Sequence, residues 1–214
     1  MEEILTTGER IKHTAHELFM QFGLKSVSMD DIATKLGMSK KTIYQYYADK
    51  DALVDDVIKS VLEHSEACCD IDKKRADNAV HEIFLAMDFI MEVFRTMNPS
   101  LLFDMQKYYP TAYLKFAKHK NDYLFGIIKQ NLKRGIEEGL YREDLNVEVI
   151  ARFRVESMML PFNPEFYTKV KSNLAAIEQE ITLHFLFGMV SPKGYKLATK
   201  YHQDRLKKIN KDEK

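Results

Sequence analysis

The sequence has few of the residues that interrupt regular structure. Only 8 glycines and 5 prolines occur in 214 residues, so tight turns are few. Hydrophobic residues make up 45% of the chain and charged residues 30%, which excludes the composition of a disordered protein. Leucine, alanine, glutamate, lysine and 11 methionines favour helices. The composition therefore predicts an all-α globular protein.

The chain also lacks an excess of either charge and any long apolar run. With 32 basic and 32 acidic side chains its formal net charge is zero, which argues against a protein that coats nucleic acid by bulk electrostatics. Any contact with DNA therefore has to be local. No run approaches the roughly twenty apolar residues of a membrane-spanning helix, and the start has no secretory signal. We expect a cytoplasmic protein with no membrane segment.

Signals of catalysis, metal binding and disulfides are weak or absent. The only cysteines, Cys68 and Cys69, are adjacent and therefore poor partners for a structural disulfide, as suits a reducing cytoplasm. His13 and His16 with Glu17 have metal-ligand side chains, but on one helix they more often form a solvated face. There is no Gly-rich phosphate loop, HExxH or GxSxG motif. We expect no enzyme activity, no cofactor and no metal.

Residues that cap helices punctuate the first fifty positions. Four side chains of the N-cap type precede apolar residues at helical spacing, namely Thr6, Ser28, Ser39 and Asp49. Gly23 and Gly37 stand where glycines commonly end helices. The pattern predicts helices over 7–22, 29–36 and 40–47, with a fourth from residue 50.

The second and third of these helices have the spacing of a helix-turn-helix. Only Met38 and Ser39 separate Gly37 from the third helix. In a helix-turn-helix the second helix enters the major groove of DNA. At 100° per residue, Ile43 and Tyr47 point together toward the preceding helix, so the opposite, polar face is directed outward.

A longer pattern surrounds this hairpin, from residue 22 to residue 53. It comprises Phe22-Gly23, Asp31-Ile32-Ala33, Gly37-Met38-Ser39, Thr42-Ile43-Tyr44, Tyr46, Lys50 and Leu53. In order and spacing these residues resemble the TetR family of transcriptional regulators. Lys41 departs from the family pattern, where many relatives have glycine, and Tyr47 stands where phenylalanine is usual. The resemblance covers about the first quarter of the chain.

Nine side chains are candidates for DNA contact. On the wheel Lys41, Thr42 and Gln45 point away from the buried side, and glutamine suits adenine while lysine suits guanine. Lys40 lies on a flank of the wheel, from which it could donate to a phosphate, whereas the resemblance implies base contacts from Lys40, Lys41 and Gln45. It implies phosphate contacts from Ser28, Ser39, Thr42, Tyr44, Tyr46 and Lys50.

Prolines and asparagines predict where later helices begin. Asn98-Pro99 and Pro110 have the pattern of a cap or first helical residue, the second before a long helix over 111–138. Asn163-Pro164 opens another helix, and Pro192 is expected to close the globular part.

The resemblance implies a larger helical bundle after the DNA-binding domain. We expect a helix-turn-helix domain over 1–50, a ligand-binding and dimerisation domain over 51–192 and a basic tail over 193–214. The tail either approaches DNA or keeps the chain soluble, and we favour solubility. Helices over 146–160 and 165–188 would form the homodimer interface. A well-buried core helix explains the apolar faces of the second equally well.

Aromatic and methionine side chains beyond residue 80 suit an apolar, adaptable cavity for a small effector. The candidates are Phe84, Met87, Met91, Phe94, Phe103, Tyr108, Tyr113, Phe116 and Tyr123. Such a stripe is more often plain core. The sequence thus predicts a regulator of double-stranded operator DNA, a repressor released by a small apolar or aromatic ligand. The alternative is a ligand-independent architectural DNA-binding dimer.

Overall fold

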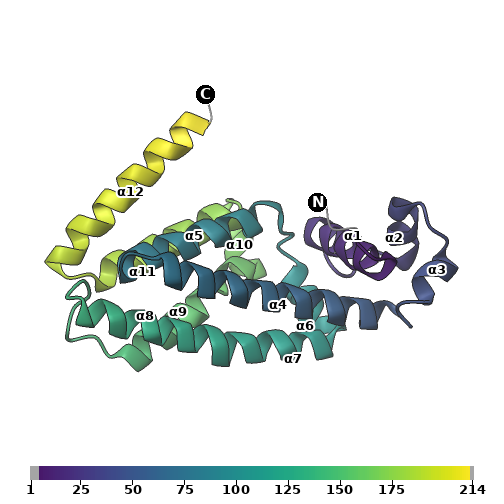
Figure 1. Cartoon of the computed structure of the whole chain (residues 1–214), viewed down its shortest axis with the longest axis horizontal. Coiled ribbons are helices and arrows are strands. Elements are labelled where there is room, and N and C mark those ends of the chain that lie inside the picture. The colour runs from purple at the N-terminus through teal and green to yellow at the C-terminus, as the bar shows by residue number, and fades with distance from the viewer. Residues whose placement is uncertain (1–4, 213–214) are drawn as a thin grey trace. The chain divides into compact units, whose positions relative to one another are not determined.

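The computed structural model describes residues 5–212, and the side chains of residues 5–207. Within this range every regular element is helical (Figure 1). The single β-bridge in this range joins Tyr141 to Val190. The predicted all-α fold is confirmed. None of the described helices combines the length and apolar character needed to cross a membrane.

The helices fall into two compact units, and the first contains the residues up to Ser65 together with Thr96–His119. Its elements are α1 (Thr7–Phe22), α2 (Met29–Leu36), α3 (Lys40–Tyr44), the first part of α4 (Lys50–Arg75), α6 (Leu101–Tyr108) and α7 (Pro110–Lys118). The predicted helix-turn-helix domain over 1–50 therefore shares a compact unit with residues far along the chain. The division at residue 50 remains a prediction.

The second unit contains Glu66–Arg95 and the residues from Lys120 onward. After the end of α4 its elements are α5 (Ala79–Thr96), the π-helix η1 (His119–Leu124), α8 (Phe125–Glu137), α9 (Val147–Ser157), the 3-10 helix η2 (Leu160–Phe162), α10 (Pro164–Val170), α11 (Leu174–Met189) and α12 (Pro192–Asp212).

Reciprocal capping fixes the starts of the first two helices. The Glu9 amide donates to Thr6 Oγ1 at 3.3 Å, and the Thr6 amide donates to Glu9 Oε2 at 2.7 Å. Ser28 and Asp31 repeat this arrangement at 3.1 and 2.7 Å. Gly37 ends α2 in the left-handed region, with φ of +63°. These local interactions confirm the predicted bounds of α1 and α2.

One apolar core holds the first unit together. Helices α1 to α4 contribute fully buried side chains, and α6 and α7 add Leu101, Met105 and Ala112 to the same core. The buried Asp104 on α6 accepts a hydrogen bond from the Lys25 amide at 3.0 Å. The chain before α2 is thereby bonded to α6, a contact that the sequence pattern did not indicate.

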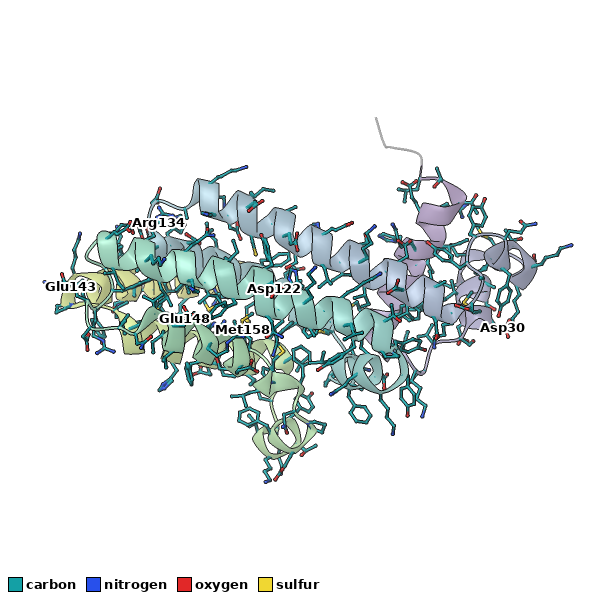
Figure 2. All side chains as sticks on the ribbon, turned by 90° about the horizontal axis from the view of Figure 1, so that it is seen from below. Asp30, Asp122, Arg134, Glu143, Glu148 and Met158 are labelled. Carbon is teal, nitrogen blue, oxygen red and sulfur yellow. The ribbon has the colours of Figure 1, made fainter. Side chains whose placement is uncertain are left out.

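A second core and a partly buried ion-pair network hold the other unit. The guanidinium of Arg134, labelled in Figure 2, donates to Glu138 at 2.7 Å, to Glu82 at 3.1 Å and to the Ala76 carbonyl at 3.1 Å. Each of its three nitrogens has a partner, although the side chain is still 31% exposed.

The sequence located the long helix correctly but missed its irregularity. Pro110 is the first residue of α7, and helical structure continues to Glu137. It is not one uniform α-helix, because residues 119–124 form a π-helix. The side-chain pattern alone does not distinguish such a segment from α-helix.

Two other predicted helix bounds are wrong. Asn98-Pro99 does not open a helix, because the Asn98 side chain accepts from the Ser100 amide at 2.9 Å and α6 begins only at Leu101. The expected helix over 165–188 is divided at Lys171, which has φ of +52° and ends α10.

The prediction that Pro192 closes the globular part is also wrong. Pro192 is the first residue of α12, whose Ala198 is completely buried in the second core. Tyr201 accepts from Asn78 at 3.1 Å and stacks on His81 with ring centres 4.9 Å apart. Most of the predicted basic tail is therefore a helix packed on the second unit.

Replacement of Gly194 by alanine tests this packing. A Cβ there would lie 1.9 Å from the Leu140 carbonyl oxygen, a backbone atom that cannot rotate away. We expect Gly194→Ala to lower the free energy of unfolding by about 1–3 kcal/mol, measured by urea denaturation. The control is Gly126→Ala, whose Cβ meets nothing within 4 Å and which should be neutral or stabilising. Equal stability of both variants would contradict the docking of α12.

Candidate DNA interface

The inner side of α3 is anchored by Ile43, which is 0% exposed in the first core. Tyr47 is half-buried and donates its hydroxyl to Asp56 Oδ2 at 2.8 Å. Burial and this carboxylate raise the pKa of Tyr47 well above its ordinary value. The predicted inward orientation of these two side chains is confirmed. The short helix therefore has a defined inner and outer side.

The outer side of α3 and the turn after it consists of polar and aromatic side chains. Exposed there are Lys40, Lys41, Tyr44, Gln45 and Tyr46, and Thr42 is half-buried. The helix ends at Tyr44, earlier than predicted, but Gln45 keeps helical angles and so stays on the predicted face. A protein that recognises base edges needs hydrogen-bond donors and acceptors on one exposed face, and this face provides them.

Lys40 has an ion-pair partner within its own unit. Its ammonium donates to Asp30 Oδ2 at 2.9 Å, and this hydrogen bond raises the pKa of Lys40. Both side chains are at least half exposed. Exposed pairs of this kind contribute little to stability, so Asp30 can be exchanged for a phosphate at low cost.

Two of the hydroxyls predicted to contact phosphates, those of Ser28 and Ser39, also serve as helix caps. Ser39 Oγ accepts from the Thr42 amide at 3.1 Å and lies 2.8 Å from the Thr42 hydroxyl. Ser28 donates its hydroxyl to Asp31 at 2.6 Å. Both serines are exposed. A phosphate contact from the Ser28 hydroxyl would require it to exchange its bond to Asp31.

Lys50 does not join this exposed set. Its ammonium donates to the Leu24 carbonyl at 2.5 Å and lies 5.8 Å from the ring centre of Phe19 and 5.5 Å from that of Tyr109. Burial lowers the pKa of Lys50. The same environment raises the pKa of Tyr109 to about 12, mainly through burial. Lys50 is therefore directed into the first unit.

One exposed cation near these residues was missed by the sequence analysis. Lys25 precedes the cap of α2, is exposed, and donates to the Tyr108 hydroxyl at 3.1 Å. This contact raises the pKa of Lys25 and lowers that of Tyr108. The only signal in the sequence was a lysine three positions before the Ser28 cap.

The candidate ligand residues are divided between the two units. Phe103, Tyr108, Tyr113 and Phe116 belong to the first unit, where the last three pack against its core. The other five belong to the second unit, namely Phe84, Met87, Met91, Phe94 and Tyr123. Neither unit contains all nine.

Residues 11–57 match the family model of the bacterial regulatory proteins of the tetR family. This match covers α1 from residue 11, the whole of α2 and α3, and the beginning of α4. Over these residues the chain matches the TetR family, whose members are DNA-binding transcriptional regulators that function as dimers. The predicted resemblance to this family and the predicted regulator class are confirmed.

Relatives extend the similarity beyond the helix-turn-helix. The HTH-type transcriptional regulator YvaF of Bacillus subtilis is 26% identical over 165 residues, which are 75% of this chain and 84% of YvaF. The HTH-type transcriptional repressor KstR2 of Mycobacterium tuberculosis is 25% identical over 149 residues, 68% of this chain and 74% of KstR2. A TetR-family regulator from Agrobacterium tumefaciens has the same fold, with a TM-score of 0.72 at 17% identity, covering 86% of this chain and 97% of the other.

Removal of the Lys50 ammonium tests its internal role. Lys50→Met keeps most of the side-chain length but deprives the Leu24 carbonyl of its closer donor and leaves it only the Tyr109 hydroxyl at 3.5 Å. We expect a loss of about 1–3 kcal/mol in the free energy of unfolding, and no change in the salt dependence of DNA binding.

The exposed Lys35→Met is the matched control and should leave stability unchanged. The internal role would be refuted if Lys50→Met unfolded at the wild-type denaturant concentration while the slope of log affinity against log salt fell by about 0.9, the value for one lost phosphate contact.

Proposed function

We propose that this TetR-family regulator is a homodimeric repressor that binds a palindromic operator and is released by a small apolar or aromatic ligand. The proposal rests on the polar face of α3, which is exposed on the side opposite the buried Ile43. This helix lies within the residues that match the family model.

In this proposal α3 lies in the major groove, where some of its side chains contact bases and others contact phosphates. Lys41 and Gln45 lie four positions apart on the exposed face, as side chains that reach neighbouring base pairs would. Tyr44 and Tyr46 donate to phosphates beside them, with Lys40, Thr42, Ser39 and Ser28. The internal position of Lys50 favours a supporting role under this surface over direct contact.

Base reading can be tested by alanine substitutions. Lys41→Ala and Gln45→Ala should each weaken binding to the palindrome upstream of the gene, measured by fluorescence anisotropy. The expected loss is roughly 5- to 150-fold, since one base contact is worth about 1–3 kcal/mol.

The control is Lys74→Ala, which removes an exposed lysine in the second unit. Wild-type affinity that is the same for an unrelated duplex would instead support the architectural alternative. That alternative is disfavoured by the zero net charge of the chain.

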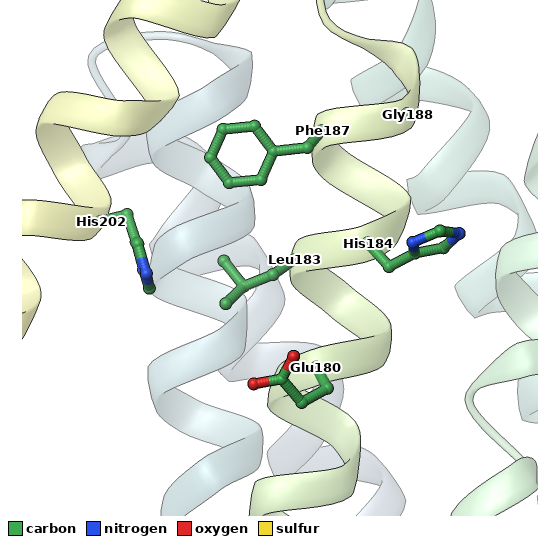
Figure 3. Close-up of a pocket in the computed structure, with 6 residues that line it drawn as sticks. All are labelled: Glu180, Leu183, His184, Phe187, Gly188 and His202. Atoms are coloured by element: carbon green, nitrogen blue, oxygen red, sulfur yellow. The ribbon is translucent and has the colours of Figure 1, made fainter.

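Homodimerisation is proposed through α9 and α11. On α9, Val149 and Phe153 are four residues apart and are 59% and 53% exposed, which is unusual for large apolar side chains. On α11, the exposed His184 and Gly188 line a surface pocket of about 600 Å³. Leu183 and Phe187 point toward the helix that carries His202 and pack on the chain's own core, while His184 points to the other side (Figure 3). The backbone of Gly188 is uncovered, because a Cβ there would meet nothing within 4 Å.

The substitution Phe153→Glu tests this interface. A charge at this position would repel the partner or be buried unpaired, so we expect the mass in sedimentation equilibrium to fall from twice the 25.0 kDa of one chain toward a single chain. Leu114→Glu, at an exposed leucine of α7, should leave the mass unchanged. A Phe153→Glu variant that remains dimeric would exclude α9 as the interface.

The proposed effector site lies in the second unit. Phe84 and Met87 are buried in its core, Met91 packs against it, and Phe94 meets Phe162 edge-on with ring centres 5.2 Å apart. KstR2 is described as a ketosteroid transcriptional regulator, which supports a small apolar molecule as the class of effector. Binding of such a ligand would favour a dimer whose two α3 helices no longer fit successive turns of the groove.

A further inference from the structure

A buried ion pair joins α9 to α11 inside the second unit. The side chains of Arg154 and Glu178 are 11% and 2% exposed. Arg154 Nη2 donates to Glu178 Oε1 at 2.7 Å and to Thr182 Oγ1 at 2.8 Å, and the Thr182 hydroxyl lies 3.2 Å from the same carboxylate oxygen. The remaining buried residues of these two helices are apolar, apart from Ser157.

Each member of the pair has one buried polar atom that makes no hydrogen bond. Among the residues that the structure describes, Arg154 Nη1 and Glu178 Oε2 have no hydrogen-bond partner, although both atoms are shielded from solvent. Arg134 provides the contrast, since all three of its nitrogens are bonded. A buried donor or acceptor without a partner costs about 1–3 kcal/mol, more when the group is charged.

The two unused atoms complement each other, because one donates and the other accepts. The centre of the Arg154 guanidinium lies 5.5 Å from the ring centre of Phe185, so an aromatic wall stands beside the polar pair. A polar donor and acceptor beside apolar side chains is the usual composition of a small-molecule site.

We infer that Arg154 and Glu178 form the polar end of the effector site, and that they bind a neutral hydroxyl or primary carboxamide group. Such a group accepts a hydrogen bond from Arg154 Nη1 and donates one to Glu178 Oε2. This inference rests on the proposed ligand-responsive function and specifies the chemistry of the ligand.

The charges of the pair exclude the other simple head groups. A carboxylate would meet the Glu178 carboxylate, an ammonium would meet the Arg154 guanidinium, and a hydrocarbon would leave both atoms unpaired. Burial raises the pKa of Glu178 against the opposing effects of Arg154 and Thr182, so a donor to Oε2 would stabilise the ionised carboxylate. A neutral group with both a donor and an acceptor satisfies every atom.

Four one-ring probes that differ in their polar group test this selectivity in the absence of DNA. They are benzamide, benzoate, benzylamine and toluene, titrated into the full-length dimer and followed by NMR line broadening. We expect a dissociation constant for benzamide at least 10-fold below those of the other three. Failure of benzamide to bind, or equal binding of the four probes, would overturn the inference.

Two variants separate recognition from stability. Glu178→Gln leaves Arg154 as a net positive charge, so the preference should change from benzamide to benzoate. Arg154→Met combined with Glu178→Leu replaces the pair by apolar side chains of similar size, which is often neutral or stabilising for the fold. This double variant should bind toluene at least as tightly as benzamide.

The matched control is Glu137→Gln, an exposed glutamate of the same unit, which should retain the wild-type preference for benzamide. If the double variant kept that preference, the pair would be a purely structural ion pair. Operator binding is measured separately on the wild type. Its absence would refute the proposed repressor while the benzamide preference stood, and loss of the preference alone would refute only the ligand chemistry.

Discussion

Burial of Ile43 determines which side of α3 faces outward, and the rest of the candidate interface follows from it. With this side chain at 0% exposure in the first core, Lys41 and Gln45 are left on the opposite, exposed face. The hydrogen bond from Tyr47 to Asp56 adds a second fixed point on α4. A helix of five residues has little stability of its own, so its orientation depends on these tertiary contacts.

The support for this surface comes partly from residues that are distant in sequence. Met105 and Ala112 share the core of α1 to α4, Asp104 bonds the Lys25 amide, and the ring of Tyr109 lies beside the Lys50 ammonium. The unit that carries the helix-turn-helix is thus completed by α6 and α7. In the second unit, Arg134 has all its nitrogens bonded, whereas Arg154 leaves one nitrogen for the polar group of a ligand.

Local interactions made much of the fold predictable. The reciprocal helix caps at Thr6 and Ser28 each join residues only three positions apart, so the sequence indicates them directly. The π-helix over 119–124, the left-handed Lys171 and the burial of Ala198 depend on packing between distant segments, which no local pattern records. At the candidate site a helical wheel gives the direction of side chains along α3, but Lys50 lies beyond that helix and binds a carbonyl 26 residues earlier.

Lysine acetylation of the free and DNA-bound protein, followed by mass spectrometry, tests the central claim most directly. The account predicts that Lys41 reacts readily in the free protein, that Lys40 reacts more slowly because its ion pair with Asp30 raises its pKa, and that the operator duplex protects both. Lys74 should react equally in both states, and the internal Lys50 should react slowly in both. Lys40 and Lys41 that stay fully reactive when the protein is saturated with operator would show that α3 does not face the DNA.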